Sequence, residues 1–129
     1  MNKAPFITPY ISMEIRDDIL YFTYLSGGTI HLDIAKEIVN QRLEYTNKVP
    51  YPLLVTYEGL RAMDKQARDY FAAKEGVEGV LAASLVVNSI YTQFFGNMFL
   101  KITQTSIPSK LFTDKQEALK WLEQFKPKS

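Results

Sequence analysis

Cysteine is absent from this sequence, and His31 is its single histidine. Without cysteine the chain has no disulfides, no thiolate zinc site and no cysteine nucleophile. One histidine alone also leaves transition-metal sites without their usual ligands. A magnesium site built from carboxylates would be indicated by a spacing such as D-x-D-x-D, which does not occur. We therefore expect no metal and no other cofactor.

Motifs of catalysis and of nucleotide binding are missing as well. A serine nucleophile would need His31 and a G-x-S-x-G turn, and the sequence contains no such turn. The pair Gly27-Gly28 is accompanied by neither G-x-G-x-x-G nor a Walker lysine, so a plain turn is the better interpretation. Asp17 and Asp18 are adjacent, and their carboxylates therefore point apart; turn chemistry explains them. We expect a protein that is not an enzyme.

Long apolar runs and a concentrated charge of one sign are also lacking. The longest apolar stretch, residues 80–87, is much shorter than the roughly 20 residues that a membrane span needs. The first residues lead into no apolar signal segment, and the net charge is +1 with the two signs interspersed. We expect no membrane span, no nucleic-acid partner and, because cysteine is absent, a cytoplasmic location.

The composition is that of one globular domain. The 129 residues are 47% hydrophobic and 22% charged, which supplies enough apolar material for one core and argues against disorder. The sequence has no internal repeat, no low-complexity tract and no linker-like stretch. We expect a single domain over residues 1–129, with loose ends at residues 1–5 and 126–129.

The first predicted element is a β-hairpin. Ile11, Met13 and Ile15 alternate with polar residues, which is typical of a half-buried strand. Asp17-Asp18 supplies the turn, and residues 19–25, rich in β-branched and aromatic side chains, form the second strand.

Helices and strands alternate after this hairpin. Apolar residues recur with helical spacing in four segments, and short apolar runs typical of strands separate them. The predicted helices cover residues 33–47, 64–75, 89–102 and 114–125, and the predicted strands cover residues 53–57, 80–87 and 107–112. The order β-β-α-β-α-β-α-β-α predicts an α/β fold. We expect a mixed, mostly parallel sheet of about five strands with an N-terminal antiparallel hairpin, covered by about four helices.

The predicted helix over residues 89–102 has an unusually wide aromatic stripe. Phe94, Phe95, Met98 and Phe99 belong to it. Core packing is the simplest explanation. The alternative is that the stripe is wider than one sheet face can bury, and that part of it covers a subunit contact or an apolar ligand pocket. These four residues are therefore candidates for an interface or a pocket.

The turn before the second predicted helix carries a family resemblance. Gly59-Leu60-Arg61-Ala62-Met63-Asp64 resembles the loop of STAS domains, the family of the anti-sigma-factor antagonists. The C-terminal segments Leu111-Phe112-Thr113-Asp114 and Glu117–Leu122 are similar to the ending of uncharacterised bacterial SpoIIAA-like proteins. The resemblance implies a STAS-like fold over nearly the whole chain.

One residue of this loop departs from the family pattern. In the antagonists, the residue after the aspartate is a serine or threonine that a partner kinase phosphorylates, whereas this chain has Lys65. Lysine cannot accept that phosphate, and it places a positive charge at a helix N-terminus, where negative charge is favoured. Asp64 is explained by helix capping, with a binding role as the alternative. The turn Asp64-Lys65 is thus the candidate binding or regulatory site, without the switch of the antagonists.

Two functional hypotheses follow. The first is a non-enzymatic regulatory or interaction module that meets a protein partner, or a second copy of itself as a homodimer, through Asp64-Lys65 and the neighbouring aromatic helix. The second is a small domain that binds an apolar ligand or lipid, because STAS-like folds resemble the lipid-exchange domains of the Sec14 class in architecture. The sequence identifies neither the partner nor the ligand.

Overall fold

The computed structural model of the protein describes residues 2–58, 62–87 and 106–127. Their centre is one six-stranded sheet in which the strands follow each other in chain order. The strands are β1 (Lys3–Ile7), β2 (Ile11–Arg16), β3 (Ile19–Tyr24), β4 (Tyr51–Tyr57), β5 (Val80–Val86) and β6 (Ser109–Phe112). The helices are α1 (Leu32–Tyr45), α2 (Lys65–Ala72) and α4 (Lys115–Leu122), and α4 continues into a 3₁₀ turn, η2 (Glu123–Phe125).

The sheet is mixed, as predicted. β1 with β2 and β2 with β3 are antiparallel pairs, whereas β3, β4, β5 and β6 run parallel. Asp17 and Asp18 both have positive φ, 51° and 63°, and connect Arg16 to Ile19 in a two-residue turn. Such a turn matches the twist of a hairpin, and aspartate tolerates this backbone region. The predicted hairpin is confirmed.

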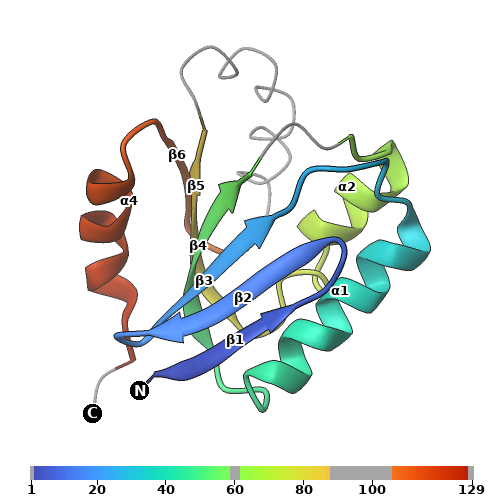
Figure 1. The fold of residues 1–129 in the computed structure, drawn as a ribbon. Coiled ribbons are helices and arrows are strands. Elements are labelled where there is room, and N and C mark those ends of the chain that lie inside the picture. The colour runs from blue at the N-terminus through green and yellow to red at the C-terminus, as the bar shows by residue number, and fades with distance from the viewer. Residues whose placement is uncertain (1, 59–61, 88–105, 128–129) are drawn as a thin grey trace.

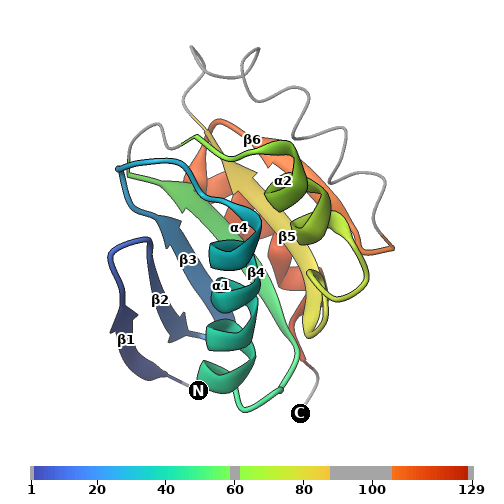
Figure 2. The same ribbon diagram turned by 90° about the vertical axis from the view of Figure 1, so that its right-hand side faces the viewer.

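The helices lie on the two faces of the sheet, as Figure 1 shows with α1 and α2 on one side and α4 on the other. In the second view, α1 and α2 lie in front of the strands and α4 behind them (Figure 2). Alternate strand residues therefore enter two cores. The larger core contains Met13, Phe22 and Val55 with Ile38 of α1. The smaller core lies under α4 and is built from Ile19, Leu54, Ala82, Ala118 and Leu122.

The N-terminal strand corrects two expectations. Residues 1–5 were expected to be loose, and about five strands were expected, but Lys3–Ile7 forms β1 on β2 and makes the sheet six-stranded. The Tyr45 hydroxyl of α1 donates to the carbonyl oxygens of Lys3 and Ala4, at 3.2 and 2.6 Å. The Lys3 ammonium in turn donates to the Tyr45 carbonyl. A side chain more than forty positions away therefore orders this segment.

The other end of the chain is also held in part. Lys126, expected in a loose tail, has its Nζ 2.8 Å from Asp17 Oδ2 and 3.0 Å from Glu123 Oε1. This contact ties the end of η2 to the turn between β2 and β3. The predicted helix over residues 89–102 lies outside the described residues, so three of the four predicted helices can be compared, and all three are present. Within the described residues, no helix is long and apolar enough to cross a membrane.

Candidate functional site

Two loops are joined at the start of α2. The Ile30 amide donates to the Ala62 carbonyl at 2.9 Å, and the Asp64 amide donates to the Ile30 carbonyl at 3.1 Å. Ile30 and Met63 thereby form an isolated parallel bridge beyond the ends of β3 and β4. Ile30 is fully buried. This pairing fixes the position of the predicted turn Asp64-Lys65 relative to the first residue of α1.

Asp64 makes two separate bonds at this point. Its Oδ1 accepts from the Ala67 amide at 2.8 Å, which is the N-cap predicted from the sequence, and its Oδ2 lies 2.9 Å from His31 Nδ1. The amide of Ala67 and, to a smaller extent, His31 hold the pKa of the Asp64 carboxyl below its usual range. Since His31 is the N-cap residue of α1, the pair links the N-termini of two helices.

Lys65 is the first residue of α2 and points into solvent, with 74% of its side chain exposed. Its Nζ lies 2.8 Å from Asp69 Oδ2, one helical turn further on. This pair offsets the positive charge at the helix N-terminus, although an exposed pair of this kind contributes only a few tenths of a kcal/mol. Lys65 is therefore available to a partner at small cost in stability.

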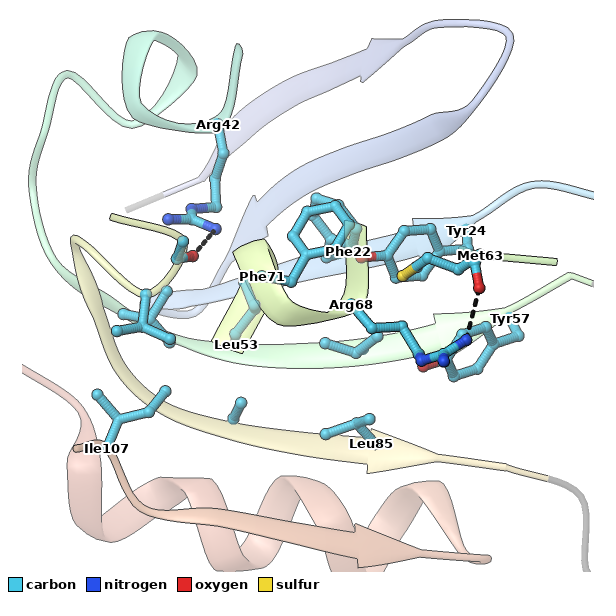
Figure 3. Close-up of a pocket in the computed structure, with 15 residues that line it drawn as sticks. Phe22, Tyr24, Arg42, Leu53, Tyr57, Met63, Arg68, Phe71, Leu85 and Ile107 are labelled. Atoms are coloured by element: carbon cyan, nitrogen blue, oxygen red, sulfur yellow. Dashed lines mark hydrogen bonds between the residues drawn. The ribbon is translucent and has the colours of Figure 1, made fainter. Parts of the chain in front are cut away.

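A cavity of about 90 Å³ lies behind this corner, between α2 and the sheet. Its walls are mainly apolar side chains of β3, β4, β5 and α2, and Figure 3 shows them around Phe22 and Phe71. Two tyrosines, Tyr24 and Tyr57, stack at one end with ring centroids 5.4 Å apart. Burial raises the pKa of both phenols well above the usual range, so neither serves as a phenolate base near neutral pH.

Two arginines line the same cavity. Arg42 of α1 donates to the carbonyl oxygens of Gly76 and Glu78, at 3.2 and 2.6 Å, and Arg68 of α2 donates to the Met63 carbonyl at 2.7 Å. In Figure 3 the two guanidinium groups lie on opposite sides of Phe22 and Phe71. Burial lowers the pKa of Arg42 from its usual value.

Arg42 is the residue that sequence reasoning missed. The apolar residues Ala35, Ile38 and Val39 of the first helix are buried, and Arg42 shares their face and is only 5% exposed. A signal was present, since Ala35, Ile38, Arg42 and Tyr45 follow each other at spacings of three and four. Arg42 was not assigned to this buried face because charged side chains are rarely buried.

The other predicted site residues can be placed only in part. The predicted turn Asp64-Lys65 lies at the exposed start of α2, and its Asp64 cap is confirmed. Phe94, Phe95, Met98 and Phe99 lie outside the described residues, so their role as an interface or pocket remains a prediction. Within the described residues, no group of three or more metal-binding side chains is found.

The fold identifies the class of protein to which the chain is similar. An uncharacterised protein of the DUF3478 family from Shewanella loihica PV-4, described as having a SpoIIAA-like fold, superposes with a TM-score of 0.57 at 16% identity. The match covers 87% of this chain and 91% of the other. At this identity the likeness shows the fold alone, and it agrees with the predicted SpoIIAA-like architecture.

A family model identifies the sequence family of the chain more specifically than the shared fold does. Residues 13–126 match the family described as a domain of unknown function, DUF7793, and the chain belongs to that family. The matched range begins within β2 and ends after η2, so it includes most of β2 and every later described element, but not β1. Comparison with curated proteins gives no match.

Proposed function

We propose that the chain is a non-enzymatic interaction module that meets a protein partner, or a second copy of itself, at the start of α2. The contact between His31 and Asp64 carries this proposal, because it fixes two helix N-termini and their loops as one surface. A surface that is ordered before binding loses less conformational entropy when a partner docks. The absence of cysteine supports a cytoplasmic location as part of the same proposal.

Lys65 defines the chemistry of this surface. Its ammonium group is exposed and its one described ion pair, with Asp69, is exposed as well and therefore easily exchanged for a partner's carboxylate. With lysine at this position, binding is not switched by phosphorylation of residue 65. We expect charge reversal of Lys65 to weaken the contact more than reversal of a lysine elsewhere.

The absence of native cysteine allows a direct test. A Lys65→Cys variant and a matched Lys120→Cys variant are expressed in the native host, and each is labelled with one photo-crosslinker at its single cysteine. Position 120 lies on the exposed face of α4. We expect one defined adduct from position 65, lost when Asp64→Ala is added, and none from position 120. Light scattering after size-exclusion chromatography shows whether the partner is a second copy. Equal labelling at both positions would count against the proposed surface.

Binding of a small apolar ligand is the second candidate function, and the cavity beside α2 favours it. Its volume of about 90 Å³ corresponds to about three water molecules of liquid, well below the roughly 300 Å³ of common ligand pockets. The cavity therefore fits a compact ligand and not a lipid chain. Native mass spectrometry of protein from its own host tests this function: a bound small molecule supports it, and protein free of any ligand contradicts it.

A further inference from the structure

Arg42 carries a charge in an unusual place. It lies on the inner face of α1, only 5% exposed, and both of its hydrogen bonds go to neutral backbone carbonyls. Within the described ranges, no aspartate or glutamate forms an ion pair with it; the ion pairs there belong to Arg16, His31, Lys65 and Lys126. Buried charges are normally paired, since removing an unpaired ion from water is costly.

The guanidinium also retains hydrogen-bonding capacity. Arginine has five N–H donors, and two are used by Gly76 and Glu78, which leaves three without a described acceptor. Glu78 contributes its backbone carbonyl, while the residue itself is exposed. The remaining donors suit an anion with oxygen acceptors, which is the group that a guanidinium binds best.

The remaining walls of the cavity restrict what such an anion can be. Phe22, Leu53, Phe71 and Leu85 present apolar surface, so an anion with oxygens on every side, such as phosphate, would leave some of them unpaired. A single charged end with an apolar tail satisfies both parts of the site. A volume near that of three water molecules limits the tail to a few carbon atoms.

We propose that the cavity binds a short-chain monocarboxylate, with its carboxylate on Arg42 and its tail among Phe22, Phe71 and Leu85. This inference rests on the second candidate function and specifies its ligand class. Arg68 lines the cavity but does not bind the carboxylate in this proposal, because it is only partly buried and its guanidinium already bonds the Met63 carbonyl. Glu78 interacts electrostatically with Arg42 but forms no ion pair with it, and the carboxylate of the ligand provides a direct partner.

The first test uses the unaltered protein. Propionate, its neutral isostere propionamide and inorganic phosphate are titrated at constant ionic strength, with amide and arginine side-chain NMR shifts as the readout. We expect saturable shifts with propionate at Arg42 and along the cavity walls, and at least tenfold weaker binding of propionamide and of phosphate. Phosphate binding as tight as propionate would overturn the monocarboxylate assignment and identify a general anion site.

Variants separate this inference from the function on which it rests. Arg42→Lys keeps the charge but loses the planar donor set, and we expect it to lower the affinity for propionate at least fivefold. We expect Arg68→Gln to change that affinity less than twofold. Ala83→Leu, which fills the cavity from β5, is expected to abolish binding of both ligands. If propionamide binds as well as propionate, the anion assignment is wrong and the ligand function stands; if neither binds, both are wrong. The comparison of ligands on the unaltered protein tests the monocarboxylate assignment even if an Arg42 variant does not fold.

Discussion

The two faces of the sheet differ in what they bury. The face under α1 and α2 holds large apolar side chains, a buried arginine and a cavity. The face under α4 holds a small cluster, and α4 contacts β4, β5 and β6. Polar side chains of β2 and β3, such as Glu14 and Thr23, lie on that second side. The first face thus combines apolar packing with a buried charge and a cavity, whereas the second packs α4 against the sheet.

The difference in core size is expected to appear in the free energy of unfolding. Ile38→Ala on the first face should cost about 3–4 kcal/mol, because its neighbours are held on all sides and leave a cavity. Leu122→Ala on the second face should cost about 2–3 kcal/mol, since the short helix α4 can shift into the space. Urea denaturation measures both losses. A larger loss for Leu122→Ala would reverse the ranking of the two faces.

Arg42 sharpens the comparison, because it is a charged member of the first core. Arg42→Met leaves the carbonyls of Gly76 and Glu78 without their donors, and we expect a net loss of about 2 kcal/mol after the relief of the buried charge. Arg68→Met, which removes one partly buried bond, should cost about 0.5–1 kcal/mol. Thermal unfolding of both variants tests this. An unchanged or higher stability of Arg42→Met would mean that the buried charge costs more than its bonds contribute.

The second face contains a hydroxyl that contributes no bond. Ser84 Oγ is buried and has no partner among the described residues, whereas the hydroxyls of Thr23 and Thr56 on the same side lie 2.8 Å apart. Ser84→Ala should therefore be neutral or stabilise by up to about 0.5 kcal/mol, while Thr23→Ala should destabilise by about 0.5–1 kcal/mol. Chemical denaturation of the two variants gives the comparison. A cost above about 1 kcal/mol for Ser84→Ala would show that its hydroxyl is bonded in solution.

The smallest expected effect is on the stability of the protein at different pH values. Asp64 at the start of α2 and Asp17 in the turn between β2 and β3 both have a carboxyl pKa below the usual value, because of the Ala67 amide and the Lys126 ammonium respectively. A lowered folded-state pKa contributes stability above the unfolded pKa, and this is lost as pH falls through the folded value. Asp64→Asn retains an N-cap but removes this titration. For Asp64→Asn and for Asp17→Asn, we expect a Tm slightly below that of the parent at pH 7 and no difference from the parent near pH 2. A difference that persists in acid would assign the loss to packing instead of charge.

Much of the fold could be predicted from local sequence. The alternation of Ile11, Met13 and Ile15 specified β2, and Asp17-Asp18 specified the turn. The cap of α2 was equally predictable, because Asp64 bonds the amide of Ala67, three residues further on. These features depend on neighbours in the chain, so periodicity and capping rules suffice.

The candidate sites could be predicted only where they are local. The turn Asp64-Lys65 was found from its motif, but its contact with His31 was not, because it joins residues 33 positions apart. The cavity was not assigned to these residues, since strands β3, β4 and β5 and helices α1 and α2 all contribute to its walls. No single segment carries a pattern that predicts such a wall.

The sequence by itself determined the hairpin of β2 and β3, the order of the described helices and strands that follow it, and, through the absence of cysteine, that no disulfide forms. The tertiary structure alone decided that Lys3–Ile7 becomes a strand, because the Tyr45 hydroxyl reaches its carbonyls across the fold. It also decided that Arg42 is buried beside the cavity, since the turn at Gly76–Glu78 closes over it. The physical reason is common to both: the free energy of a polar group depends on its partners after folding, and those partners lie far away in the chain.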